Sequence, residues 1–64
     1  MSEYKSEANG QLLNTMMFLR GIHMPFTFKQ AKAITLHRLE AECAAKPFTQ
    51  RDYLKEIIAA VKRL

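Results

Sequence analysis

The sequence predicts an all-α protein, a single domain over residues 1–64 with helices over about 3–20 or 10–20, then 28–45 and 50–64. Three observations predict this class. The tripeptide Pro-Phe-Thr occurs twice, at residues 25–27 and 47–49, and each copy precedes an amphipathic run. Apolar residues in the resulting segments recur at the spacing of a helix. No segment alternates apolar and polar residues as a half-buried strand does.

The first helix has two starts that fit its pattern. Asn9-Gly10 has the composition of a cap and turn, which would leave residues 1–8 frayed. A longer apolar stripe instead carries the helix back to near Ser2, at a cost of about 1 kcal/mol for Gly10 in a helix interior. At the other end, Gly21 is expected to take the left-handed conformation of a Schellman motif. The longer stripe consists of Tyr4, Ala8, Leu12, Thr15 and Leu19.

The two Pro-Phe-Thr copies are interpreted as helix starts. Thr27 is expected to cap the second helix, with Gln30 completing a capping box. Thr49 is expected to cap the third helix in the same way, with Asp52 as a shorter partner. Each proline also disfavours helical conformation in the residue before it, which ends the preceding segment.

The second helix, over residues 28–45, is apolar around most of its circumference. A helix of this kind lies either at the centre of a bundle or in an interface. One stripe consists of Phe28, Leu36, Leu39 and Cys43, and a second consists of Ala31, Ile34, Ala41 and Ala45. We expect the first stripe to face the core. The second, which is lined mostly by small side chains, would allow close approach of another helix.

The third helix, over residues 50–64, has a single apolar face. Its members are Tyr53, Leu54, Ile57, Ile58, Val61 and Leu64. Phe48, just before the expected cap, is predicted to form a hydrophobic staple with Tyr53. Arg51, Lys55 and Lys62 line one polar edge of this helix.

Size and composition indicate a globular chain that needs support beyond its own core. Hydrophobic residues make up 48% and charged residues 25% of the 64 residues, as in folded proteins. A chain this short buries only about 60% of the surface that its unfolded form exposes. The one cysteine cannot form an intramolecular disulfide. Oligomerisation is therefore the expected source of additional stability.

Charge and hydropathy restrict the expected classes of partner and the expected cellular location. No apolar run approaches the roughly 20 residues of a membrane span, and the first residues lack the layout of a signal peptide. We therefore expect a cytoplasmic protein without a membrane partner. The formal net charge of +4 is compatible with nucleic acid or with an acidic protein as partner.

Candidate catalytic and metal-binding residues are few. A nucleophile such as Cys43 needs an adjacent base and a pocket, and zinc needs three or four ligands, usually in close pairs. His23, His37 and Cys43 do not have such spacing. Cys43 lies on an apolar stripe, where a free cysteine usually behaves as a small buried hydrophobe. We expect no enzyme, no cofactor, no metal and no small-molecule substrate.

The preferred function is a non-enzymatic regulatory or adaptor role through protein–protein interaction. Phe18 points away from the core face of the first helix, and the methionines at 16, 17 and 24 add apolar surface. Such surface marks interaction sites when it is exposed. We expect a homodimer, with a further protein as a second partner. The candidate interface residues are Phe18, Ala31, Ile34, Ala41 and Ala45.

The alternative is a small basic DNA-binding regulator of the helix-turn-helix kind, with the third helix as the reader. Its candidate nucleic-acid contacts are Lys29, Lys46, Arg51, Lys55 and Lys62. Two features count against it. The second helix is long for such a unit, and the expected solvent face of the third helix carries Asp52, Glu56, Ala59 and Ala60.

In length, basic charge and helix-only pattern, the whole chain resembles the small accessory proteins encoded in the early regions of temperate bacteriophages. The likeness lies in the style of the chain and includes no residue motif, so it assigns no site residues. The resemblance implies binding to host factors or regulation of transcription, in the cytoplasm of the host.

Overall fold

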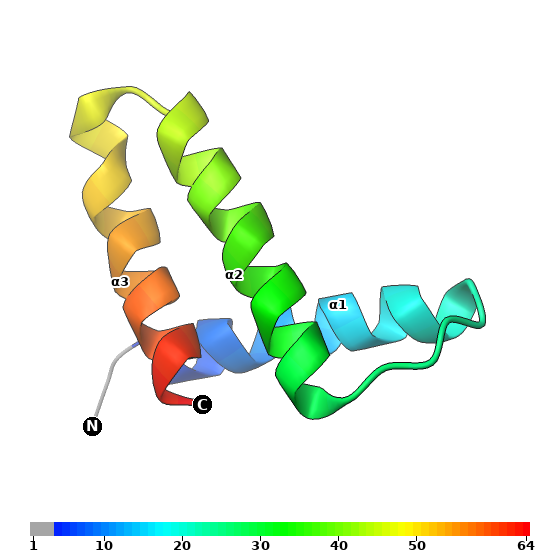
Figure 1. Cartoon of the computed structure of the whole chain (residues 1–64). Coiled ribbons are helices and arrows are strands. Elements are labelled where there is room, and N and C mark those ends of the chain that lie inside the picture. Colours follow the sequence, from blue (N-terminus) through cyan, green and yellow to red (C-terminus); the bar gives the residue numbers. More distant parts are fainter. Residues whose placement is uncertain (1–3) are drawn as a thin grey trace.

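The computed structural model describes residues 4–64, and three helices account for most of them. They are α1 (Lys5–Gly21), α2 (Phe28–Ala45) and α3 (Arg51–Arg63), with a short 3-10 helix, η1 (Phe48–Gln50), before α3. Residues 4–64 contain no strand, which confirms the all-α prediction with three helices. In Figure 1, α2 and α3 run side by side in opposite directions, and α1 crosses the lower end of this hairpin. The C-terminal half of α1 extends beyond it.

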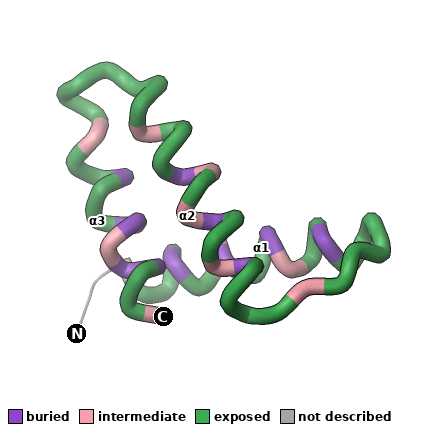
Figure 2. The backbone as a smooth tube through the Cα atoms, in the orientation of Figure 1, coloured by how far each residue is buried: buried purple, intermediate pink, exposed green. Residues whose placement is uncertain are grey.

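Helix α1 is continuous through Gly10, so the prediction of a start at residue 10 is wrong. The longer start is supported as far as the structure describes the chain, whereas residues 2 and 3 lie outside the described part. Lys5 is the first helical residue, and Tyr4 is the N-cap residue, whose side chain makes no capping hydrogen bond. The predicted stripe is confirmed. Ala8, Leu12, Thr15 and Leu19 are buried along one side of α1 (Figure 2).

The end of α1 is a Schellman motif, but His23 rather than Gly21 takes its left-handed position. Gly21 is still helical, and His23 has a φ of 58°. The His23 N–H donates to the Arg20 carbonyl at 3.1 Å, and the Met24 N–H donates to the Leu19 carbonyl at 2.9 Å. These two bonds define the motif. The expected position of the motif was therefore wrong by two residues, because α1 continues through the glycine.

The first Pro-Phe-Thr copy starts α2 as predicted. The Thr27 hydroxyl accepts a hydrogen bond from the Gln30 N–H at 3.1 Å. The Gln30 side-chain oxygen in turn accepts one from the Thr27 N–H at 2.9 Å. Together they form the complete capping box.

The second copy behaves differently, and the prediction that Thr49 caps α3 is wrong. Thr49 lies inside η1, and the Gln50 N–H donates to the Pro47 carbonyl at 2.9 Å. Gln50 precedes α3 without a side-chain cap. Phe48 is 77% exposed, so it does not act as the predicted staple. Tyr53 instead packs edge-to-face on Tyr4, with ring centroids 5.5 Å apart.

The core forms where the three helices meet. One buried cluster joins α1 to the hairpin and consists of Ala8, Leu39, Leu54, Ile57, Ile58, Ala60 and Val61. A smaller cluster, Leu12, Leu19 and Ala31, joins α1 to the start of α2. Between them, the Thr35 hydroxyl donates to the Thr15 hydroxyl at 2.6 Å, and both side chains are buried.

The core face of α2 differs from the predicted stripe. Ala31, Thr35 and Leu39 are buried, with Leu36 and Cys43 partly buried beside them. Phe28, which was assigned to the core, is half exposed because it lies at the first position of the helix, past the edge of the bundle. Ala60 of α3 is buried, although it was expected on the solvent face.

The molecule is thin, and this leaves much of each helix exposed. Its Cα atoms extend over 37 × 28 × 15 Å, and the shortest dimension corresponds to only two layers of helices, because packed helix axes lie about 8–10 Å apart and the Cα atoms lie about 2.3 Å from each axis. The accessible surface is 4773 Å², against about 4200 Å² for a folded monomer of 7.4 kDa. The chain therefore exposes several hundred square ångströms more than a typical folded monomer of its mass.

Candidate interaction surfaces

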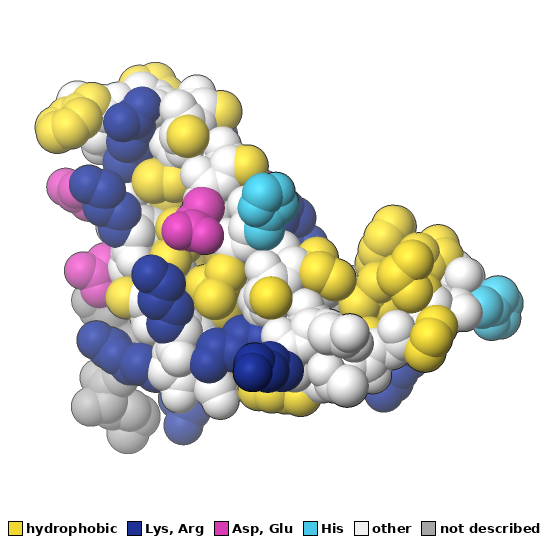
Figure 3. Space-filling view, in the orientation of Figure 1, with side chains coloured by type: hydrophobic (Ala, Val, Ile, Leu, Met, Phe, Trp, Pro, Cys, Tyr) yellow, Lys and Arg dark blue, Asp and Glu magenta, His cyan; other side chains and the backbone are white. Residues whose placement is uncertain are grey.

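Large exposed hydrophobic side chains gather at one end of the molecule. Of the nine in residues 4–64, seven lie between residues 13 and 34, each 43–65% exposed. We call this set the apolar surface, and it consists of Leu13, Met17, Phe18, Ile22, Met24, Phe28 and Ile34. Figure 3 shows hydrophobic side chains massed over the C-terminal half of α1. The other two, Phe48 and Tyr53, lie on η1 and on α3.

The exposure follows from the way α1 is packed. Its buried stripe faces the hairpin, and past Thr15 the buried contact is the small cluster of Leu19 with Leu12 and Ala31. Leu13 and Met17 lie one turn apart on another side of the helix, since residues four apart are neighbours. Phe18 lies on a third side. Since the hairpin covers one side only, the remaining apolar side chains of this segment face solvent.

A shallow apolar cleft of about 290 Å³ lies within this end of the molecule. It forms where the loop after α1 returns to the first turns of α2. Leu19 is buried at its base, and the other lining side chains come from the loop and from α2. The lining residues are Leu19, Met24, Pro25, Phe26, Gln30, Ala33 and Ile34.

Four of the five predicted interface residues are exposed. Phe18 and Ile34 belong to the apolar surface, and Ala41 and Ala45 are exposed farther along α2. Ala31 is 0% exposed, packed in the cluster with Leu12 and Leu19. Its assignment to an interface is therefore corrected, because its side chain has no surface left for a second molecule. The assignment failed because the core face of α2 is rotated relative to the predicted stripe.

Sequence reasoning missed three members of the apolar surface, namely Leu13, Ile22 and Phe28. A signal was available for Leu13, because Leu13 and Met17 are spaced four residues apart and form a second stripe. No comparable signal existed for Phe28, whose exposure depends on where the bundle ends.

The predicted nucleic-acid contacts fall into three places. Arg51, Lys55 and Lys62 line one cleft of about 460 Å³ between α2 and α3, together with Glu40 and Cys43. Lys46 lines a different cleft, and Lys29 is exposed at the start of α2. Figure 3 shows Lys and Arg side chains along α3, away from the hydrophobic end.

One of these basic residues, Arg51, caps a helix end, and so does Lys32, which is not among them. The Arg51 guanidinium donates to the Lys46 carbonyl at 3.0 Å and to the Ala44 carbonyl at 3.2 Å, at the end of α2. Lys32 donates to the Lys62 carbonyl at 2.8 Å, at the end of α3. Basic side chains commonly satisfy the last carbonyls of a helix in this way. The Lys55 ammonium lies 6.0 Å from the centre of the Phe48 ring. Arg51 therefore has a structural role.

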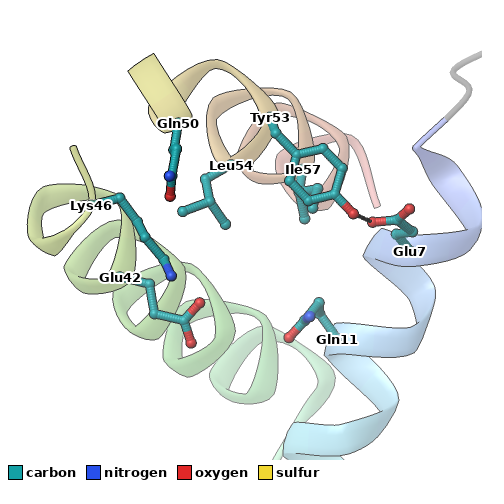
Figure 4. A pocket seen from close by; sticks show the side chains of 8 residues that line it. All are labelled: Glu7, Gln11, Glu42, Lys46, Gln50, Tyr53, Leu54 and Ile57. Carbon is teal, nitrogen blue, oxygen red and sulfur yellow. Dashed lines mark hydrogen bonds between the residues drawn. The ribbon is translucent and has the colours of Figure 1, made fainter. Parts of the chain in front are cut away.

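A third cleft, of about 530 Å³, opens between the hairpin and the start of α1. Figure 4 shows Glu42 on α2 and Lys46 just past its end, facing Glu7 and Gln11 on α1 across the cleft, with Leu54 and Ile57 on the α3 side. The Tyr53 hydroxyl donates a short hydrogen bond to the Glu7 carboxylate. This bond raises the pKa of Tyr53 above its usual value of 10.0. The pair closes one side of the cleft and links α3 to α1.

The three residues considered for catalysis or metal binding are dispersed. Cys43 is half-buried, with its thiol 4.0 Å from the Arg51 carbonyl. His37 is exposed on α2, and His23 is exposed after α1. Within residues 4–64, no group of three or more His, Cys, Asp or Glu side chains is arranged to hold a metal ion. None of the described helices is both long and apolar enough to cross a membrane.

No family model, curated protein or solved structure matches this chain.

Proposed function

We propose that the protein is a non-enzymatic regulatory or adaptor protein that acts through protein–protein interaction and assembles as a homodimer. The observation that carries this proposal is the apolar surface, seven large side chains that each remain 43–65% exposed within one short segment. Monomeric soluble proteins rarely expose contiguous apolar patches of more than a few hundred square ångströms. A partner that covers this apolar surface removes it from water, which favours association.

The size of the apolar surface suits a stable interface. Seven large side chains, each about half exposed, present on the order of 700 Å² in total, over more than one side of α1, if each offers about 200 Å² when free. A standard interface takes about 800 Å² from each partner. The basic cleft between α2 and α3 lies outside this surface, which leaves it free to meet a further partner.

A charge placed in the apolar surface tests the homodimer. Ile34→Glu leaves the folded monomer intact because Ile34 is exposed, but it buries an unpaired carboxylate in the dimer. Light scattering across a concentration series measures the dimerisation. We expect the Ile34→Glu variant to dimerise at least about tenfold more weakly than the wild type, which corresponds to about 1.4 kcal/mol. Phe48→Glu is the matched control, because Phe48 is exposed but lies outside the apolar surface. If the Ile34→Glu variant dimerises as strongly as the Phe48→Glu variant, the interface lies outside the surface around Ile34.

DNA binding through α3 is the second candidate function. It is favoured by the grouping of Arg51, Lys55 and Lys62 along one cleft. The antiparallel arrangement of α2 and α3 (Figure 1) counts against DNA binding, because the two helices of a helix-turn-helix unit cross at a wide angle. Glu40 in the same cleft would also repel phosphates.

A salt series separates the two functions. If DNA binding were the main activity, affinity for random duplex DNA would fall steeply with salt, and Lys55→Glu with Lys62→Glu would abolish it. Arg51 is left unchanged in this test because it caps α2. A lysate pull-down tests the adaptor role. A stoichiometric protein partner that is retained when Lys55 and Lys62 are changed would support it, and strong salt-dependent DNA binding would contradict it.

A bacteriophage origin and a cytoplasmic location are further parts of this proposal. They rest on the style of the chain, its net charge of +4 and the helix-only pattern. A small accessory protein that binds host factors needs an interaction surface and no catalytic site. Recovery of a host protein in the pull-down would fit this role.

A further inference from the structure

We infer that the homodimer is held by a reciprocal anchor, in which Phe18 of each chain inserts into the apolar cleft beside Leu19 and Ile34 of a second copy. This inference rests on the proposed homodimer and deepens it, because it names the side chain and the cleft that meet. In a two-fold dimer the same surface serves both chains, so a protruding group and a receiving cleft on one surface are used twice.

The cleft has the size and lining that such an anchor needs. Its volume is about 290 Å³, whereas a buried cavity of about 150 Å³ already accommodates benzene. A phenyl ring therefore fits with room for the neighbouring backbone. Leu19 and Phe26 lie at the α1 and loop side of the cleft, and Ala33 and Ile34 lie on α2. Ala33 keeps the α2 side open, because its side chain is a single methyl group.

Among the exposed aromatic side chains, Phe18 is the best suited to act as the anchor. It is 64% exposed although it lies within α1, directly before Leu19, which is buried at the base of the cleft. Aromatic side chains dominate the centres of interfaces, because they bury a large area at a low entropy cost. Phe28 is also aromatic, but its exposed fraction is smaller. Phe48 is more exposed but lies at the far turn of the hairpin, away from the cleft.

The total area argues that the occupant is a second copy. The apolar surface offers on the order of 700 Å² per chain by the same reckoning as above, close to the roughly 800 Å² that each partner contributes to a standard interface. A small ligand in the cleft would leave Phe18 and its neighbour one turn on, Ile22, exposed. A second copy brings an equal apolar surface and covers these side chains as it fills the cleft.

Two variants, measured separately and as a mixture, test the reciprocal contact. Phe18→Ala removes the anchor and keeps the cleft, whereas Ala33→Trp fills the cleft and keeps the anchor. Both positions are exposed, so both variants are expected to fold, and circular dichroism checks the helix content. Each variant alone loses both insertions of its homodimer. The mixed pair regains one, because Phe18 of the Ala33→Trp chain meets an intact cleft.

Native mass spectrometry of the separate and mixed variants gives the result. We expect each variant alone to dimerise at least about tenfold more weakly than the wild type. The mixture should form a heterodimer that is tighter than either variant homodimer. A mixture no more dimeric than its components, or a Phe18→Ala variant that dimerises like the wild type, would overturn the anchor and leave the homodimer standing. A monomeric wild-type chain would instead remove the homodimer itself.

Discussion

His23 holds a left-handed backbone conformation, with φ of 58°, at an exposed position after α1. That conformation costs a non-glycine residue about 1–2 kcal/mol. We therefore expect His23→Gly to raise the free energy of unfolding, by up to about 1 kcal/mol once the greater freedom of glycine in the unfolded chain is subtracted. Urea denaturation measures the change. A loss of stability would show that the His23 side chain contributes more than its strained backbone costs.

Gly21 provides the complementary test at the same helix end. It is helical, and a Cβ atom added there would meet nothing within 4 Å. Gly21→Ala should therefore raise the free energy of unfolding by about 0.5 kcal/mol. If Gly21 were left-handed, as the sequence suggested, the same substitution would destabilise the protein. The sequence predicted the motif correctly but not its position, since the length of α1 depends on packing farther along the helix.

The two Pro-Phe-Thr copies differ at the scale of the element, although their sequences are identical. Thr27 caps α2 with both bonds of the capping box, whereas Thr49 lies inside η1. Thr27→Ala should lower the free energy of unfolding by about 1 kcal/mol. Thr49→Ala is the matched control and should change it by less than about 0.5 kcal/mol. Equal losses in the two variants would mean that Thr49 also acts as a cap.

The buried hydroxyl pair between α1 and α2 is a second feature of element packing. The Thr35 hydroxyl donates to the Thr15 hydroxyl at 2.6 Å, and the Thr15 hydroxyl donates to the Gln11 carbonyl at 3.2 Å. Thr35→Val should cost about 1 kcal/mol, because it leaves the Thr15 hydroxyl facing an apolar group. The double variant with Thr15→Val should cost less than the sum of the two single variants. Simple additivity in this cycle would show that the two hydroxyls are not coupled.

The elements themselves were largely predictable, and their faces were less so. Periodicity predicted the buried side of α1, and Thr27 with Gln30 predicted the start of α2. The rotation of α2, which buries Ala31 and exposes Phe28, depends on how three helices meet. A helix that is apolar on most sides does not by itself indicate which side becomes the core.

For the whole molecule, the sequence indicated more apolar surface than a small core can hide, and the structure shows where that surface lies. Phe18 and Ile34 were predicted to be available, and both are exposed. The cleft beside them could not be predicted. It depends on the path of the loop from Met24 to Phe26 over the first turns of α2.

The mass of the wild-type protein in solution distinguishes a homodimer from a monomer. Sedimentation equilibrium at micromolar concentration should give a mass near twice 7.4 kDa, because covering the apolar surface favours the homodimer. Dilution should shift the mass towards that of one chain. A well-folded protein that stays at 7.4 kDa throughout the concentration series would contradict the account.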